Sequence, residues 1–150
     1  SETAPGPTTT TAPPADVDCE ALTAARERLT AATNAELERL GIDRSDPRAF
    51  SVQVIVTSQQ AAEYWAAVRD AVGPGEAELR ADADTVVAYW EPLDDDLDAI
   101  SLPDAGEASI AEATQRYVEI SEQHPDDQVV PAQERLTAGL DAACGEVVTP

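Results

Sequence analysis

Apolar residues recur at steps of three and four along almost the whole chain after residue 18, which is the spacing of an amphipathic α-helix. Asp18 is placed to cap a first helix that ends at Gly41. Asp46-Pro47 then reads as an N-cap followed by Pro at the first helical position. The stripe of this second helix is predicted to run through Phe50, Val54, Ala61, Trp65, Val68 and Val72. Residues 51–58 are rich in β-branched side chains and allow a strand, but the unbroken stripe favours a helix.

The pattern continues after the Gly73-Pro74-Gly75 turn with three more helical segments. Pro92 lies inside the first of them and predicts a kink or a break. Asp104 with Glu107 resembles a capping box that opens the next helix. A last helix is predicted over 129–144. Short connections favour antiparallel neighbours, so the sequence predicts an all-α fold, an antiparallel bundle of four to five helices.

The chain has two cysteines, Cys19 and Cys144, and each lies near one end of the helical region. We expect a disulfide that joins the terminal helices, with two buried free thiols as the alternative. No second Cys or His stands near either residue, which disfavours a zinc site.

The beginning of the chain has a composition that does not support a packed core. Its first eighteen residues contain four Pro and five Thr, and Val17 is the one large apolar side chain. We therefore expect a flexible tether over residues 1–17 and a helical bundle domain over 18–150. The tether resembles the stretch that follows the lipidated cysteine of a bacterial lipoprotein, with Ser1 after that cysteine. The resemblance implies an extracytoplasmic, membrane-tethered lipoprotein of the cell envelope, and a secreted protein is the alternative.

The charge balance narrows the range of partners. Thirty acidic residues against nine basic ones, all of them Arg, give a formal net charge of −21. Nucleic acid and anionic membrane surfaces repel such a chain, so we expect no nucleic-acid partner. No apolar run approaches the roughly 20 residues of a membrane helix, so we expect no direct membrane insertion by this segment. The acidic side chains keep an alanine-rich bundle soluble.

Two Tyr-Trp pairs, Tyr64-Trp65 and Tyr89-Trp90, account for most of the aromatic residues. Both Trp residues fall on the inward stripe of their helices and are expected to fill the core. Adjacent helical residues point about 100° apart, so Tyr64 and Tyr89 are expected to flank the core with their hydroxyls in water. The alternative is a groove at these four residues that binds a small apolar ligand or the helix of an envelope protein.

An acidic run follows Pro92, with Asp94, Asp95, Asp96 and Asp98 as candidate calcium ligands. Calcium takes six to eight oxygen ligands, and a turn rich in Asp provides such oxygens. On a helix, however, these four carboxylates spread around the axis instead of converging. The other interpretation is a solvated acidic run, and calcium is the one cofactor that the sequence suggests.

Catalytic signatures are missing from the sequence. His124 is the only histidine, and because it precedes a Pro at a helix end we expect it to be a solvated cap residue. No nucleophile motif, Cys-x-x-Cys pair or Gly-rich phosphate loop occurs. We therefore expect a non-enzymatic binding or interaction module outside the cytoplasm. A calcium-binding structural or sensor domain is the alternative, and a hydrolase that uses carboxylates alone comes third.

Overall fold

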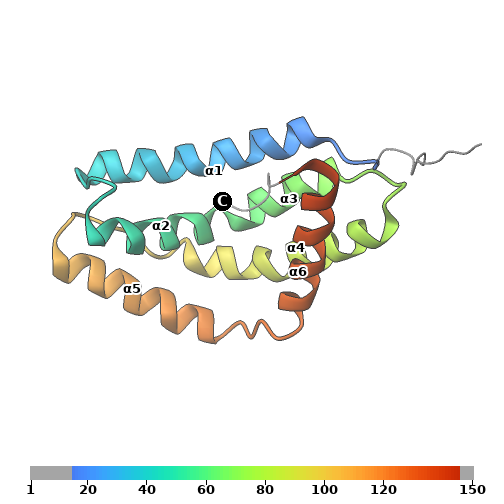
Figure 1. The fold of residues 1–150 in the computed structure, drawn as a ribbon. Coiled ribbons are helices and arrows are strands. Elements are labelled where there is room, and N and C mark those ends of the chain that lie inside the picture. Colours follow the sequence, from blue (N-terminus) through green and yellow to red (C-terminus); the bar gives the residue numbers. More distant parts are fainter. Residues whose placement is uncertain (1–14, 146–150) are drawn as a thin grey trace, which may run out of the picture.

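The computed structural model describes residues 15–145, and within this range the chain forms six α-helices and no strand longer than an isolated bridge (Figure 1). The predicted all-α class is confirmed. The helices are α1 (Cys19–Leu40), α2 (Pro47–Gln59), α3 (Ala61–Ala71), α4 (Ala77–Leu97), α5 (Glu107–Glu122) and α6 (Val129–Cys144).

The first five helices run back and forth along one direction, and α6 crosses α4 steeply (Figure 1). α3 continues in the general direction of α2. α1 and α4 run opposite to this pair, and α5 runs in the same direction as it. α6 ends beside the beginning of α1, where Cys19 and Cys144 form the predicted disulfide with a Cα–Cα distance of 5.6 Å. The prediction of four to five antiparallel helices is therefore right in class and wrong in detail. Six helices form between residues 15 and 145, and the last of them, α6, crosses α4.

The additional helix comes from a break at Gln60, which divides the predicted second helix into α2 and α3. Residues 51–58 lie inside α2, so the helical interpretation of this β-branched stretch is confirmed. No break occurs at Pro92, which lies within α4 with its ring exposed to solvent. Because α2 and α3 are separate helices, their inward faces need not form one stripe.

The break at Gln60 is stabilised by hydrogen bonds with the last turns of α4. A carboxylate oxygen of Asp94 accepts a hydrogen bond from Ala62 N at 2.7 Å, at the beginning of α3. In the other direction, Gln59 Nε2 donates to the carbonyl oxygens of Leu97 and Ile100, each at 3.0 Å. The first N–H groups and last C=O groups of a helix lack partners within that helix. The beginning of α3 thus receives an acceptor from α4. The carbonyl groups at and just after the end of α4 receive a donor from Gln59, the last residue of α2.

The N-caps predicted from the sequence for α1 and α2 are confirmed, and the capping box predicted for α5 is wrong. Asp18 accepts from Ala21 N and Gly41 takes a left-handed φ of 70°, while Asp46 caps α2 as predicted. The capping box predicted from Asp104 does not form. Gly106 is the N-cap of α5, and Asp104 Oδ1 accepts from Gly106 N at 2.7 Å within the preceding turn.

Two hydrophobic clusters form the core. The first lies between α1, α3, α4 and α6, and it includes Leu22, Leu29, Val68, Val86, Leu136 and Leu140. The second lies between the end of α1 and helices α2, α4 and α5, and it includes Leu37, Val52, Ile55, Leu93, Leu97 and Ile110. The predicted inward position of Phe50 is wrong, because its side chain is 72% exposed, and Val54 is only half-buried. Val52 and Ile55 take the inward positions of α2, since this helix is rotated independently of α3.

The N-terminal tether lies mostly outside the described residues, as residues 1–14 are not described. Asp16 and Val17, which the sequence assigns to the tether, pair with the turn between α3 and α4. Val17 forms an antiparallel bridge with Val72, and Asp16 O accepts from Gly73 N at 2.8 Å. Asp16 and Val17 therefore contact the helical domain through their backbone groups. No helix between residues 15 and 145 combines the length and apolar character needed to cross a membrane.

Candidate functional site

A groove of about 480 Å³ lies where α4, α5 and α6 meet the α5–α6 loop. Helices α5 and α6 both pack on α4, but α6 crosses α4 steeply and diverges from α5 (Figure 1). The space between them is therefore open above α4. Its lining consists of Tyr89, Trp90 and Leu93 from α4, Tyr117, Val118, Ser121 and Glu122 from α5, His124, Pro125 and Asp126 from the loop, and Val129, Val130 and Gln133 from α6.

The second Tyr-Trp pair borders this groove, and its polar atoms tie the surrounding elements together. The Tyr89 hydroxyl donates to the His124 carbonyl oxygen at 2.8 Å. Trp90 Nε1 donates to Gln133 Oε1 at 3.4 Å, and the two rings meet edge to face with centroids 5.5 Å apart. Burial raises the pKa of Tyr89 above its ordinary value, so its hydroxyl stays protonated to well above neutral pH. The pair thus connects α4 to the loop and to α6.

His124 contributes to the same arrangement, contrary to the expectation of a solvated cap residue. Its side chain is half-buried, and Nε2 lies 2.7 Å from Asp96 Oδ2. The ring is thereby held against α4, while the backbone carbonyl of the same residue accepts from Tyr89. Among residues 15–145, no hydrogen bond joins this imidazole to a Ser or Cys side chain. Its visible role is to fix the α5–α6 loop over the end of the groove.

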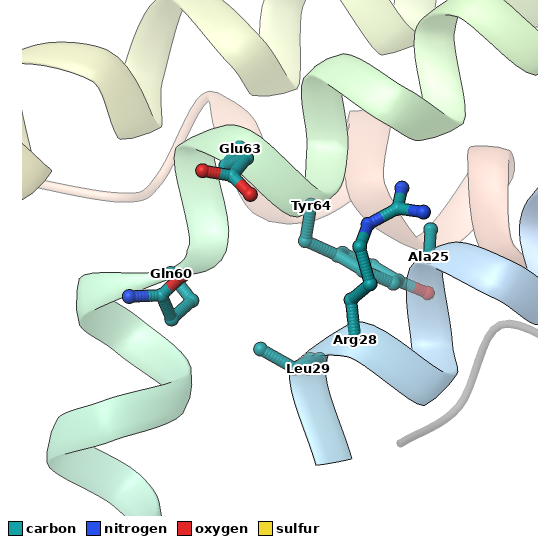
Figure 2. Close-up of a pocket in the computed structure, with 6 residues that line it drawn as sticks. All are labelled: Ala25, Arg28, Leu29, Gln60, Glu63 and Tyr64. Atoms are coloured by element: carbon teal, nitrogen blue, oxygen red, sulfur yellow. The ribbon is translucent and has the colours of Figure 1, made fainter. Parts of the chain in front are cut away.

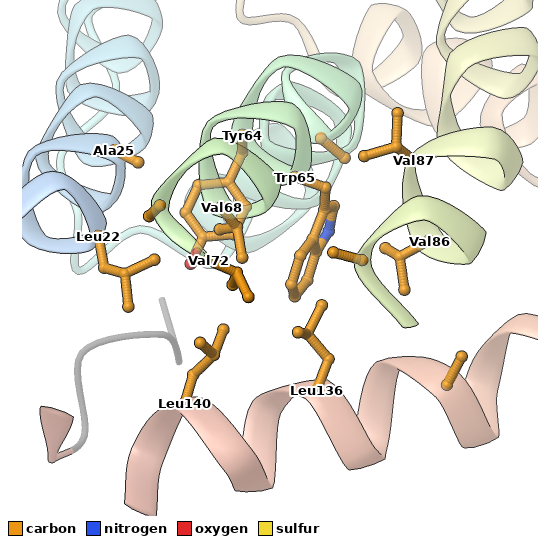
Figure 3. Packing of buried hydrophobic residues seen from close by; sticks show 14 of the residues in the cluster. Leu22, Ala25, Tyr64, Trp65, Val68, Val72, Val86, Val87, Leu136 and Leu140 are labelled. Carbon is orange, nitrogen blue, oxygen red and sulfur yellow. The ribbon is translucent and has the colours of Figure 1, made fainter. Parts of the chain in front are cut away.

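The first Tyr-Trp pair lies in the core, away from the groove (Figure 3). Trp65 is buried between Val86 and Leu136, so its predicted role as a core residue is confirmed. Tyr64 is only 6% exposed, so the prediction that it flanks the core is wrong. Burial raises the pKa of Tyr64 to about 12. Of the four candidate ligand-binding residues, Tyr89 and Trp90 are the two that line the groove.

A small depression beside Tyr64 does not have the dimensions of a ligand site (Figure 2). Its volume is about 50 Å³, which is room for a few water molecules. Ala25, Arg28 and Leu29 of α1 line one side of it, and Glu63 and Tyr64 of α3 line the other. The larger groove over α4 is the candidate functional site.

Exposed valines distinguish the groove from the rest of the described surface. Three large hydrophobic side chains are exposed between residues 15 and 145, and two of them, Val118 at 43% and Val130 at 41%, line the groove. The third, Phe50, lies on α2 and outside it. Both valines fall off the inward stripe of their helices. An apolar residue on an otherwise polar helix face was the signal available in the sequence, and sequence reasoning missed it.

The acidic run does not converge on one point. Asp94 is buried and bound to Ala62 N, whereas Asp95, Asp96 and Asp98 are exposed on the last turns of α4. No group of three or more His, Cys, Asp or Glu within residues 15–145 is arranged to hold a metal ion. Calcium binding by these four residues stays a prediction.

The groove therefore combines an aromatic floor, two exposed valines and a loop that several hydrogen bonds hold in place. Comparisons with models of known protein families, with curated proteins and with solved structures found no match for this chain. Any function proposed for the groove rests on its own residues and geometry.

Proposed function

We propose that this chain is a non-enzymatic binding module that acts outside the cytoplasm and holds an apolar ligand or partner segment in the groove between α4, α5 and α6. The observation that carries the proposal is the exposure of Val118 and Val130 on the two walls of one groove. Apolar side chains that are exposed together in one groove with a polar border mark interaction sites more often than apolar side chains exposed singly. A ligand that covers both valines and the edge of Trp90 removes their apolar area from water, and this burial favours binding.

The polar groups of the groove support binding over catalysis. Tyr89, Gln133 and His124 each engage a neighbouring protein group, so they hold the walls in place instead of pointing at a reacting atom. Pre-organised walls lower the entropy lost when a ligand binds. A preformed groove lined by aromatic and aliphatic side chains is typical of ligand and peptide sites.

An extracytoplasmic setting agrees with two features of the chain. Disulfides such as Cys19–Cys144 persist mainly in oxidising compartments. The Thr- and Pro-rich beginning of the sequence suits a tether that holds the domain away from a surface. Attachment through a lipid on a preceding cysteine remains part of the proposal. Detection of an acylated cysteine by mass spectrometry of the native protein would test it.

The binding function is tested with a neutral apolar dye whose fluorescence rises in apolar surroundings. An uncharged dye is required because the net charge of −21 repels anionic probes. We expect the dye to bind the wild-type protein and to lose most of its signal with the double variant Val118→Ser, Val130→Ser. The matched control is Phe50→Ser, which removes an even more exposed apolar side chain from outside the groove.

Thermal unfolding of each variant checks that the fold is intact. All three side chains are exposed, so we expect changes in stability within about 0.5 kcal/mol. Equal loss of dye signal with Phe50→Ser and with the double variant would contradict the proposal, because it would place the dye on scattered apolar surface. Absence of dye binding to the wild-type protein would contradict it as well.

A further inference from the structure

We propose that the occupant of the groove is an amphipathic helix of a partner protein, whose apolar face covers Val118 and Val130 and whose flanks carry Lys or Arg. This inference rests on the proposed binding function and names the partner class for the same site. Three features support it: the length of the open surface along one face of α6, the small side chains on that face, and the sign of the charges around it.

The open surface extends along α6 beyond the groove. A second depression of about 500 Å³ shares Val130 and Gln133 with the groove and continues toward the end of α6. Its remaining lining residues are Glu134, Thr137, Ala138 and Asp141. The six positions from 130 to 141 follow steps of three and one, which places them on one face of α6. At 1.5 Å per residue, this face is about 16 Å long.

A helix fits this surface better than an extended peptide or a small molecule. Thr137 and Ala138 are small, so a second helix approaches α6 closely beside them. The described range has no strand with a free edge to which an extended peptide could add. A surface about 16 Å long exceeds most small ligands, whereas it matches about eleven residues of helix. Val118 on the α5 wall and Val130 on the α6 wall then contact the apolar face of the bound helix.

The charges around the open surface select a cationic partner. Glu122 and Asp126 border the groove, and Glu134 and Asp141 border its extension along α6. No Arg lines either depression. The single Arg of α6, Arg135, turns instead to Asp82 of α4, with an N–O distance of 2.9 Å. An apolar centre with an acidic border is complementary to an apolar stripe flanked by Lys or Arg.

The test uses a synthetic peptide of about 14 residues, with Leu at i, i+3, i+4 and i+7 spacing and Lys at the other positions. Fluorescence anisotropy of the labelled peptide measures its affinity for the full chain at two ionic strengths. We expect Val118→Ser with Val130→Ser to weaken binding about tenfold. We expect Glu122→Gln with Glu134→Gln to weaken it about fivefold at low salt, and to reduce its salt dependence.

Two controls separate the groove from the general acidity of the chain. Glu27→Gln with Glu38→Gln makes the same change in charge on exposed positions of α1, and is expected to change affinity by less than twofold. A scrambled peptide of equal composition, which lacks the apolar stripe, is expected to bind at least about tenfold more weakly. Equal binding of the two peptides, or equal effects of the two Glu→Gln pairs, would overturn the inference.

The outcome also separates this inference from the function on which it rests. If the neutral dye binds in the groove and the Leu-Lys peptide does not, the inference fails and the binding function stands. If neither binds, both fail. Tighter binding of a peptide with Glu in place of Lys would overturn the proposed charge of the partner while leaving a helix-binding groove in place.

Discussion

Replacement of Cys19 and Cys144 with Ser is expected to lower the free energy of unfolding by about 5 kcal/mol. The disulfide joins residues 125 positions apart, so it restricts nearly the whole unfolded chain, and the entropy removed from a loop of this length corresponds to about that amount. The folded state loses little, since α6 stays anchored by Leu136 and Leu140 in the core. Urea denaturation of the oxidised wild-type protein and of the double variant measures the difference.

Reduction provides the control for this prediction. A reducing agent should shift the unfolding midpoint of the wild-type protein close to that of the double variant, and leave the double variant unchanged. A difference below about 1 kcal/mol would contradict the prediction. It would indicate that the unfolded chain keeps its two ends together without the covalent link.

Replacement of Asp94 with Asn is expected to stabilise the protein at neutral and alkaline pH, by about 3 kcal/mol at most. Burial raises the pKa of the Asp94 carboxyl to about 6 from an ordinary value of 3.8, although the hydrogen bond from Ala62 N acts in the opposite direction. Its other oxygen, Oδ1, is buried without a hydrogen-bond partner among the described residues. A shift of about two units corresponds to about 3 kcal/mol. Asn removes the buried charge and keeps an oxygen to accept from Ala62 N.

The pH dependence of this effect follows from the direction of the shift. The folded state binds the Asp94 proton more tightly than the unfolded state, so the wild-type protein loses stability as the pH rises from about 4 to about 6. Above pH 6 the loss is complete, and below pH 4 both states are protonated. The advantage of Asp94→Asn should therefore be largest near pH 8 and close to zero near pH 4. Urea denaturation across this range measures it.

Neighbouring substitutions make the Asp94 prediction specific. Asp95→Asn makes the same change in charge at an exposed position one residue away, and is expected to change stability by less than about 0.5 kcal/mol at any pH. Asp94→Ala removes the acceptor for Ala62 N and is expected to be about 1–3 kcal/mol less stable than Asp94→Asn. Parallel pH profiles for Asp94→Asn and the wild-type protein would show that the buried carboxylate does not control this dependence.

Much of the helical architecture was predictable because its signals are local. An N-cap such as Asp18 binds an amide three residues away, and Gly41 adopts its left-handed conformation whatever packs around it. Helical periodicity likewise depends only on the spacing of apolar residues within one segment. The class of fold and the helix bounds at α1 and α6 followed from such signals. The disulfide between these helices followed from the number and placement of the cysteines.

The break between α2 and α3 was not predictable, because the groups that stabilise it are distant in sequence. Gln60 carries no strong breaking signal, whereas Pro92 does. Yet Pro92 lies on the solvent side of α4, and Asp94 supplies from α4 the acceptor that the beginning of α3 needs. A helix ends where its free backbone groups find partners, and in this case those partners come from another helix.

The different positions of the two Tyr-Trp pairs also depend on tertiary packing. They are identical as dipeptides, and both Trp residues fall on predicted inward stripes, but Trp65 is buried and Trp90 is only half-buried. Tyr64 is nevertheless buried while Tyr89 borders a groove, because the neighbours on their outer sides differ. The crossing of α6 over α4 opens the space beside Tyr89 and Trp90. No pattern within either helix encodes the angle at which a third helix crosses.

Composition and local pattern are thus sufficient for the helical class, the acidic surface, the disulfide and most helix ends of this protein. The break at Gln60, the buried carboxylate of Asp94 and the groove with Val118 and Val130 follow from how the helices pack. The physical reason is the range of the interactions. Caps and stripes join residues within a few positions, whereas a helix crossing depends on the summed packing of side chains from all the elements that meet there.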